Sequence, residues 1–508
     1  MSNDQFLYPS HEDFVQEAII ADRPLADAVR ELQSIYKADN RPWVVGFSGG
    51  KDSTVILSLT YFALKMLPPE ERHKHVYVVS SDTRVETPVV VDMIRQVLDS
   101  VNAQAILDQL PITAHSVTPE TGETFWVNLL GKGYPAPTKA FRWCTERMKI
   151  DPVSEFIKDK VARFGEVVVV LGSRREESST RAQVIARHRI DGSALGRHTS
   201  LPNAYTYMPI ELWHSEDVWE YLMSAARPWG GSNRVLFELY KDSNAGECPL
   251  VIDTNTPSCG NSRFGCWTCT VVTQDKAIEG LVNSGEDWMR PLLQFRNQLH
   301  ASSLPANKTE YRNYKRRTGK VTFARGAIDD DSTISTKHIP GPYWMRYRRE
   351  WLKLLLEIEK GIRQTDRDLE LIGRDELQAI RQQWLKDPNE PDWIDSLPKI
   401  YSEVYPNDTI EWIKNDAGAF TEPDAIILNA LETEKGVPAV LIMKLIDAEL
   451  SFSGLTRRKG ILDELQRILE QDWGSLDEAL ERRSAPLSVD MHKTAFESLK
   501  AEYDGLFQ

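Results

Sequence analysis

The chain has 508 residues, of which 41% are hydrophobic and 27% are charged, and its formal net charge is −14. A chain of this length buries a full core and is expected to divide into two or three domains. It has no apolar run of about 18 residues, as a membrane span would require. Residues 1–5 also lack the basic start of a secretory signal, so we expect a cytoplasmic protein without a membrane partner. The acidic charge excludes a uniformly basic nucleic-acid coat but leaves local basic patches open.

The first half of the chain alternates between helical and strand-like patterns. Between Pro24 and Tyr36 apolar residues recur with a helical period, so the first 40 residues are predicted to be helical. Apolar runs predict three buried strands, at 43–47, 75–79 and 167–171. Helical patterns lie between and before these strands, at 53–66, 88–99 and 151–164. This alternation predicts an α/β fold with a parallel sheet and helices on both faces.

A glycine-rich turn, Ser-Gly-Gly-Lys-Asp-Ser at 48–53, follows the first predicted strand directly. Glycines let the backbone approach an anion, and the next helix offers N–H groups at its N-terminus. Lys51 adds a positive charge, so the turn is typical of a phosphate-binding loop. Its spacing differs from G-x-x-x-x-G-K-[ST], which gives no support for an ordinary γ-phosphate hydrolase.

Two further polar turns are predicted at the carboxyl ends of strands, where parallel sheets bind ligands. The first spans residues 81–88, and its Asp82 and Thr83 are placed to contact adenosine. The second spans residues 172–181 and contains Arg174 and Arg181. Guanidinium groups bind phosphate through paired hydrogen bonds, so we expect these arginines to hold a second phosphate. The structural alternative is that Arg174 pairs with Glu177 three residues on.

Four of the five cysteines follow the spacing C-x10-C-x6-C-x2-C, and the set comprises Cys248, Cys259, Cys266 and Cys269. In a reducing compartment a metal explains such an array better than disulfides do. Four thiolates suit either zinc or an iron–sulfur cluster, and spacing alone does not separate the two. Four inert buried cysteines are the structural alternative.

Cys144, the remaining cysteine, lies between Arg142 and Arg147, with Lys149 nearby. Cationic neighbours lower the pKa of a thiol and favour the reactive thiolate. The sequence therefore indicates a lowered pKa and a candidate persulfide carrier. A buried structural cysteine beside Trp143 is the alternative.

Beyond about residue 275 the alternation stops, and helical patterns at 343–362 and 366–385 predict a helical region. Two segments, 312–320 and 346–349, place cations beside aromatics and are candidates for contact with DNA phosphates, unless they are solvated helix faces. Four parts are predicted: an N-terminal helical segment 1–40, an α/β domain 41–275 containing the cysteine segment 244–272, a helical region 276–421, and a small helical unit 422–508.

The turn at 48–53 resembles the S-G-G-x-D-S signature of the PP-loop ATP pyrophosphatase superfamily, whose members split ATP between the α and β phosphates. The G-x-R-x-x-E-S-x-x-R pattern formed by residues 172–181, together with Asp82-Thr83 and Arg142-Trp143-Cys144, is similar to the phosphoadenylylsulfate (PAPS) reductase branch. The resemblance covers roughly residues 41–275 and implies a HUP-like, adenine nucleotide alpha hydrolase-like domain. No cysteine follows Cys269, which argues against sulfate reduction through a C-terminal thiol.

Within that branch, the chain length, Cys144 and the four-cysteine array resemble the DndC-type DNA phosphorothioation proteins. This resemblance implies ATP-dependent replacement of a non-bridging DNA phosphate oxygen by sulfur. It implies DNA, DndD- and DndE-type proteins and a cysteine desulfurase as partners. A PAPS reductase, a tRNA-thiolating enzyme and a nucleotide-binding scaffold remain alternatives.

The same resemblance implies ATP, Mg2+ and a 4Fe–4S cluster as cofactors, with zinc as a weaker alternative to the cluster. The cluster ligands would be Cys248, Cys259, Cys266 and Cys269. The catalytic residues would be Lys51, Asp52, Cys144 and Arg174, with Asp52 positioning Mg2+ or ordering the loop. The nucleotide contacts would be Ser48, Gly49, Gly50, Lys51, Asp52, Ser53, Asp82, Thr83, Gly172, Arg174 and Arg181.

Overall fold

A computed structural model describes residues 8, 10–177, 179–224, 226–243, 265–324, 337–365, 369–413, 420, 422–452 and 460–484. The chain forms two compact units. The first comprises Met1–Asn307, Arg348–Gln383 and Leu397–Ile413, and the second comprises Lys308–Tyr347, Trp384–Ser396 and Lys414–Gln508. Among the described residues, no helix combines the length and the apolar character needed to cross a membrane.

The first unit is built on a six-stranded sheet in the order β5-β4-β3-β6-β8-β7. Five strands are parallel: β3 (Trp43–Gly46), β4 (Val76–Ser81), β5 (Ile112–Val117), β6 (Val167–Val170) and β8 (Ala204–Tyr207). The short β7 (Gly196–Arg197) is antiparallel to β8 at the edge. In the centre, Val45 pairs with Val78 on one side and Val170 on the other. The predicted mostly parallel sheet is confirmed.

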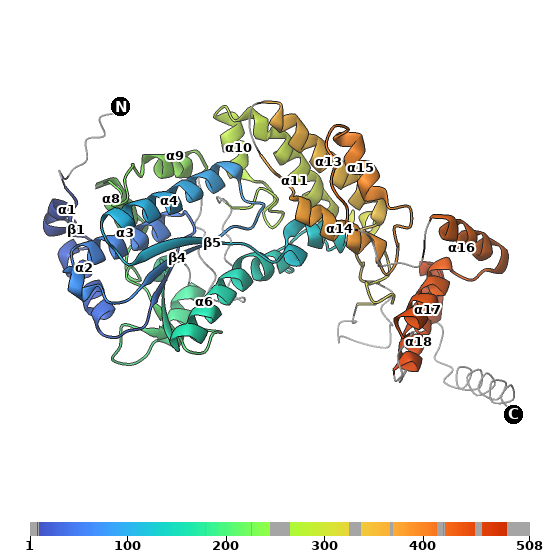
Figure 1. The fold of residues 1–508 in the computed structure, drawn as a ribbon, viewed down its shortest axis with the longest axis horizontal. Coiled ribbons are helices and arrows are strands. Elements are labelled where there is room, and N and C mark those ends of the chain that lie inside the picture. Colours follow the sequence, from blue (N-terminus) through green and yellow to red (C-terminus); the bar gives the residue numbers. More distant parts are fainter. Residues whose placement is uncertain are drawn as a thin grey trace. The chain divides into compact units, whose positions relative to one another are not determined.

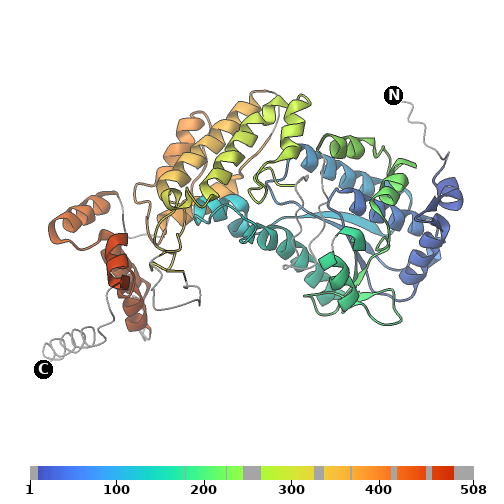
Figure 2. The same ribbon diagram turned by 180° about the vertical axis from the view of Figure 1, so that it is seen from behind.

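Helices cover both faces of this sheet, as the sequence predicts (Figure 1, Figure 2). Val45 and Val78 lie in the core with α2 (Leu25–Lys37), α3 (Lys51–Lys65) and α4 (Pro88–Leu107). The alternate positions Val44 and Val79 pack with α6 (Asp151–Phe164) on the other face. Because side chains alternate along a strand, a central strand buried on both faces must be apolar at every position. Each buried valine contributes about 1.5–3 kcal/mol.

Local signals set the ends of the helices that border the site. The extended Gly50 (φ −80°, ψ 166°) precedes α3, and Pro88 opens α4 at a position where its missing N–H costs nothing. Gly165 ends α6 with φ +84°, a conformation that favours glycine. Two π-helical turns, Val127–Gly131 and Glu146–Ile150, were not predicted.

Further helices complete the first unit, and the long ones confirm the predicted helical region. The N-terminus forms α1 (His11–Glu17) and the hairpin β1 (Ile19–Ile20) and β2 (Arg23–Pro24). The others are α5 (Trp143–Thr145), α7 (Ser179–His188), α8 (Ser215–Ser224), α9 (Arg234–Ser243), α10 (Lys276–Asn283), α11 (Arg290–Ser303), most of α13 (Met345–Arg363), most of α14 (Arg374–Leu385) and, apart from its first residue, α15 (Ser396–Val404).

The second unit is mainly helical in the part that the structure describes. It contains α12 (Lys308–Tyr311), α16 (Glu422–Lys435), α17 (Ala439–Ser451), α18 (Ile461–Leu469) and α19 (Leu476–Ser484). Isolated bridges join Lys315 to Val321 and Phe323 to His338.

Candidate functional site

The glycine-rich turn between β3 and α3 curls around the Ser53 hydroxyl. Ser53 Oγ donates to the carbonyl of Gly50 at 2.9 Å and accepts the main-chain N–H of Ser48 at 3.2 Å. Gly49 has φ +75°, and a Cβ atom there would lie 2.7 Å from Ile94 Cγ1. Both facts require glycine at this position. The turn thereby brings its backbone to the N-terminus of α3, as a phosphate-binding loop does.

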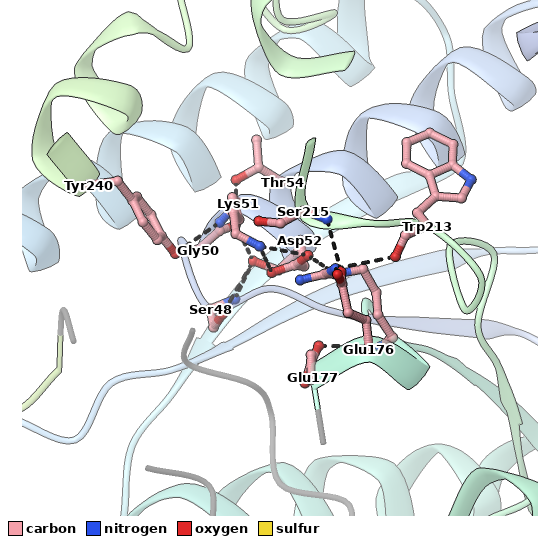
Figure 3. A network of polar contacts seen from close by, with 12 residues as sticks. Ser48, Gly50, Lys51, Asp52, Thr54, Glu176, Glu177, Trp213, Ser215 and Tyr240 are labelled. Atoms are coloured by element: carbon pink, nitrogen blue, oxygen red, sulfur yellow. Dashed lines mark hydrogen bonds and ion pairs between the residues drawn. The ribbon is translucent and has the colours of Figure 1, made fainter. Parts of the chain in front are cut away.

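Lys51 and Asp52 lie at the first turn of α3 (Figure 3). Lys51 is buried, with 3% of its side chain exposed, and its Nζ is 3.2 Å from Asp52 Oδ2. The Lys51 N–H contacts the hydroxyl of Tyr240 at 3.3 Å. A helix N-terminus already carries a partial positive charge, so a buried ammonium group there calls for negative charge. Asp52 supplies part of it, and a phosphate group would supply more.

Arg174, from the loop after β6, reaches the same turn. Its Nε donates to Asp52 Oδ1 at 2.6 Å, and Nη1 donates to Glu176 at 2.9 Å and to the Trp213 carbonyl at 3.2 Å. The Arg174 side chain is 1% exposed. These contacts place its guanidinium against protein groups, and its predicted contact with a phosphate remains a prediction. Glu177 Oε1 accepts the main-chain N–H of Arg174 at 3.2 Å.

Gly172 allows the two loops to approach each other this closely. A Cβ atom at Gly172 would lie 2.9 Å from the main-chain carbon and oxygen of Asp52. The structure therefore brings the turn at 48–53 and residues 172–174 together at the ends of the neighbouring strands β3 and β6, as the sequence predicts. Arg181 lies in α7 with a side chain outside the described residues.

The loop after β4, which contains Asp82 and Thr83, contacts the segment around Cys266. Asp82 Oδ1 accepts the main-chain N–H of Arg84 at 2.8 Å, which tightens the turn. Thr83 is fully buried, and its Oγ1 lies 3.3 Å from Cys266 Sγ. The hydroxyl of Thr83 thus contacts a cysteine, and its predicted contact with adenosine remains a prediction.

The segment around Cys266 lies along the loop after β4. Cys266 forms an isolated antiparallel bridge with Glu86, and the Trp267 N–H donates to the Val85 carbonyl at 3.0 Å. Thr87 Oγ1 donates to the Gly265 carbonyl at 2.8 Å. These main-chain contacts hold Cys266 at the same edge of the sheet as the nucleotide turn. Cys248 and Cys259 lie outside the described residues.

The thiolates of Cys266 and Cys269 act electrostatically on Cys144, which the sequence did not indicate. Burial first, and then the thiolates of Cys266 and Cys269, raise the pKa of the Cys144 thiol to about 12, and Lys149 partly opposes them. The expectation of a lowered pKa at Cys144 is therefore wrong. Arg147, one of the cationic residues near Cys144 in the sequence, instead pairs with Glu123, and its Nη1 lies 2.6 Å from Glu123 Oε2.

Glu86 and Lys149 are the charged groups beside these thiols. Burial raises the pKa of Glu86 to about 7, against the opposing charge of Lys149, whose Nζ is 3.8 Å from the Glu86 carboxylate. Burial raises the pKa of Cys266 to about 12, and Lys149 again opposes the shift. The pairing of Glu86 with Lys149 was not predicted, because it joins residues that are far apart in the sequence.

A cavity of about 410 Å³ borders this region and is lined by Asp82, Arg84, Glu86, Trp267 and Trp288, among others. Arg84 is fixed on its wall by Asp375, with both Nη···Oδ distances at 2.7 Å. The side of the cavity formed by Leu369–Gly373 and Glu376 comes from the chain just before α14 and from its first turn. The late helices therefore help to shape the site at the end of β4.

The two basic segments proposed for DNA contact are partly used inside the protein. Arg312 donates through Nε to the Gly341 carbonyl at 2.7 Å, and burial lowers its pKa to about 10. Arg348 is fully buried and donates to the Gly131 carbonyl at 2.8 Å. Arg316, Lys320 and Arg346 are exposed. The clustering of basic residues in the sequence did not distinguish arginines that are buried in the structure from those that are exposed.

Comparison with known proteins supports the assignment of the α/β region. Residues 42–272 match the phosphoadenosine phosphosulfate reductase domain. Two uncharacterized proteins of Methanocaldococcus jannaschii are similar, at 29% identity over 40% of this chain and 27% over 47%. The matches span only 36% and 44% of the lengths of those relatives.

Two solved structures show distant similarity. Candida glabrata FMN adenylyltransferase, in complex with FAD and inorganic pyrophosphate, is 15% identical with a TM-score of 0.24, covering 42% of this chain and 62% of its own. The U34-tRNA thiolase NcsA from Methanococcus maripaludis, with its [4Fe-4S] cluster, is 11% identical with a TM-score of 0.26, covering 61% and 86%. Residues 42–272 are thus similar to a phosphoadenosine phosphosulfate reductase domain, and the glycine-rich turn at 48–53 lies within the matched residues.

Proposed function

We propose that this chain is an ATP-dependent sulfurtransferase that exchanges a non-bridging oxygen of a DNA backbone phosphate for sulfur. The observation that carries the proposal is the joint position of two groups at one edge of the sheet. The Lys51–Asp52–Arg174 network occupies the ends of β3 and β6, and the Cys266 segment occupies the end of β4. The DndC-like cysteine spacing supports DNA as the substrate.

The reaction has two displacements. In the first, a DNA phosphate oxygen attacks the α-phosphorus of ATP, the bond between the α-phosphorus and the α,β-bridging oxygen breaks, and pyrophosphate leaves. The oxygen, a poor leaving group by itself, then forms part of AMP. In the second, sulfur at the sulfide oxidation state attacks the DNA phosphorus, and AMP departs with the oxygen. A cysteine desulfurase with a thiol reductant would supply that sulfur.

The residues of the PP-loop would act on the first displacement. Lys51, at the N-terminus of α3, would neutralise charge that develops on pyrophosphate, a preorganised electrostatic role. The turn formed by Ser48, Gly49, Gly50 and Ser53 would hold the phosphates through main-chain N–H groups. Asp52 would order the loop through Arg174 and bind Mg2+ with the oxygen ligands that this ion prefers.

The cluster that the cysteine spacing implies would be held by Cys266 and Cys269 together with Cys248 and Cys259, and the last two lie outside the described residues. Within the described ranges, no three His, Cys, Asp or Glu side chains are grouped as metal ligands. A bound cluster would supply a site for sulfur or electrons. Lys149 and the Thr83 hydroxyl would stabilise negative charge on the thiolates. The DndD- and DndE-type partners would supply DNA contacts, because this acidic chain uses Arg312 and Arg348 internally.

The test is the phosphorothioate content of cellular DNA, measured by nuclease digestion and mass spectrometry. Three strains would each express the partner proteins, together with the native chain, the Lys51→Met variant or the Lys65→Met variant. Lys65 lies on the same helix but is 41% exposed, which makes it a matched control. We expect sulfur-containing dinucleotides with the native chain and Lys65→Met, and a loss of at least tenfold with Lys51→Met.

Each rival activity gives a different result. If native cells lack phosphorothioate, the DNA proposal fails, and ATP-dependent pyrophosphate release stimulated by tRNA would identify a thiolase instead. Reduction of adenylylsulfate nucleotides without ATP would identify a reductase. If Lys51→Met leaves modification intact, the chain is a nucleotide-binding scaffold.

A further inference from the structure

The cavity of about 410 Å³ at the end of β4 is lined by parts of the chain that are distant in sequence. One wall is the loop after β4 with the start of α4, and the other is the segment 369–373 with the first turn of α14. Pockets for small ligands have volumes of about 300–1,000 Å³, so this cavity is large enough for one. The second wall lies outside the residues 42–272 that match the family domain.

The lining of this cavity is acidic. Among the described lining residues two are arginines and five carry carboxylates, namely Asp82, Glu86, Asp92, Glu370 and Glu376. The cations nearby already face carboxylates. Arg84 pairs with Asp375, which does not line the cavity, and Arg95 Nη1 lies 3.7 Å from Asp92 Oδ1. Lys149 faces Glu86 at 3.8 Å. The remaining negative charge disfavours a phosphate group in the cavity and favours a cation.

Glu376 has one buried carboxylate oxygen without a partner. Its side chain is 1% exposed, and its Oε2 accepts the main-chain N–H of Gly373 at 3.0 Å and lies 3.6 Å from Arg84 Nη2. Its Oε1 has no hydrogen-bond partner among the described residues. The nearby hydroxyl of Thr124 donates to the Thr121 carbonyl at 3.2 Å instead. A buried acceptor that lacks a donor is unfavourable, so Oε1 calls for a donor that the fold itself does not supply.

Capping of α14 accounts for only part of the Glu376 side chain. The contact with the Gly373 N–H is the one that a glutamate makes three residues after a helix cap, and it uses Oε2 alone. Burial raises the pKa of Glu376, and the opposing charge of Arg84 does not cancel this effect. A cation bound in the cavity would supply both the positive charge and the N–H donor that the carboxylate lacks.

The distribution of the lining groups favours an organic cation over a metal ion. In the part of the chain that the structure describes, these carboxylates do not form a group of three that could hold a metal ion. Trp267 and the half-buried Trp288 line the same space, and a hydrogen bond from Trp288 Nε1 to Glu286 holds the second ring in place. The face of an indole attracts organic cations. Dispersed carboxylates suit a group with several N–H donors, such as a guanidinium.

We propose that this cavity binds an organic cation through a guanidinium or primary ammonium group, with Glu376 and Glu370 as acceptors and Trp288 as an aromatic wall. An arginine or lysine side chain of a protein partner carries such a group, and so does a free polyamine. The cavity borders the loop after β4, so its occupant would lie beside the edge of the sheet that holds the candidate site. The inference goes beyond the proposed function and does not depend on DNA as the substrate.

The test is binding of Nα-acetyl-L-argininamide, and separately of spermidine, to the full chain without ATP or DNA. Saturation-transfer NMR of the ligand gives the dissociation constants. The native chain is compared with Glu376→Gln, Glu370→Gln and Trp288→Leu. The control is Glu357→Gln, which neutralises an exposed carboxylate on α13 that does not line the cavity. We expect the native chain and the control to bind equally, and each cavity variant to bind at least fivefold more weakly.

Circular dichroism checks that each variant folds, and Glu370→Gln decides if Glu376→Gln does not, because Glu370 is exposed. Tighter binding of the arginine derivative would identify a partner's side chain as the source, and tighter binding of spermidine a free polyamine. Binding of neither probe, or equal binding by the native chain and the cavity variants, would overturn the proposal. Displacement of the arginine derivative by adenosine would also overturn it, because the cavity would then belong to the nucleotide. Since DNA is absent, failure here is distinct from failure of the phosphorothioate assay.

Discussion

Arg174 donates through Nε to Oδ1 of Asp52 at 2.6 Å, and this ion pair joins the loop after β6 to the first turn of α3. The Arg174 side chain is 1% exposed and that of Asp52 is 15% exposed. A charge-assisted hydrogen bond between groups this buried is short and strong. Asp52 also lies against Lys51, so the position of the loop depends on Arg174.

Arg174→Lys should therefore impair turnover more than charge conservation suggests. Lysine keeps the positive charge but lacks the separate Nε and Nη1 donors. Arginine uses these to reach Asp52, Glu176 and the Trp213 carbonyl. We expect pyrophosphate release to fall at least tenfold and the free energy of unfolding to fall by about 1–3 kcal/mol. The control is Arg175→Lys, because Arg175 is 41% exposed and pairs with Glu211. Equal effects at the two positions would contradict a positioning role for Arg174.

Gly172→Ala should disrupt the same junction without changing charge. The new Cβ would lie 2.9 Å from the main chain of Asp52, so the backbone itself has to shift. We expect at least a tenfold weaker affinity for ATP and a loss of about 1–3 kcal/mol in the free energy of unfolding. Gly361→Ala in α13 is the matched control, because its added Cβ would meet nothing within 4 Å beyond its chain neighbours and the backbone of its own helix. Calorimetric titration with a non-hydrolysable ATP analogue measures the first effect and urea unfolding the second. Unchanged affinity in Gly172→Ala would refute the junction.

The elements of the central sheet could be predicted because each carries its signal locally. Strands β3 and β6 are apolar at nearly every position, and α3 follows a recognisable turn. Strands β5 and β8 escaped prediction, since His115 and Ser116 in one and Thr206 in the other interrupt the apolar pattern. Those strands depend on pairing with neighbours, which a local pattern does not contain.

The electrostatics of the site could not be predicted in the same way. The Arg142, Arg147 and Lys149 neighbours of Cys144 in sequence indicate a low thiol pKa, yet burial raises it. The partner of Arg174 is Asp52, 122 residues away, which no spacing rule reveals. Sequence gives the charged groups, whereas their solvation and pairing depend on the completed fold.

His198 should make stability depend on pH. Burial lowers its pKa to about 4, and its neutral Nδ1 accepts the main-chain N–H groups of Ser200 and Leu201 at 3.3 and 3.2 Å. As pH falls below about 6.5, the unfolded chain binds a proton that the folded chain does not, so the free energy of unfolding decreases. We expect His198→Asn, measured by urea unfolding, to lose about 1 kcal/mol less than the native chain between pH 7 and pH 5. Parallel losses in the two proteins would exclude His198 as the source.

Asp375 should also make stability fall with pH, but over a lower pH range than His198, because its folded pKa of about 2 lies below an unfolded value of about 3.9. The hydrogen bonds from Arg84 lower the pKa of Asp375 to about 2. This pair contributes fully above the unfolded pKa of about 3.9 and is lost as pH falls through 2. With Asp375 48% exposed, we expect Asp375→Asn to lower the free energy of unfolding by about 1 kcal/mol at pH 7, and by less at pH 3.

Asp92→Asn provides the control for Asp375, since Asp92 lines the same cavity but is 68% exposed and lies 3.7 Å from Arg95. Its effect should stay below about 0.5 kcal/mol at every pH. Urea unfolding of the three proteins at pH 7, 5 and 3 measures both differences. The free energies of unfolding of the native chain and Asp375→Asn are compared at each pH. If their difference is the same at pH 3 as at pH 7, Asp375 does not stabilise the fold through its ion pair with Arg84. In that case the hydrogen bond of 2.9 Å from Thr121 to the same carboxylate, which an amide can also accept, would have to hold this wall of the cavity.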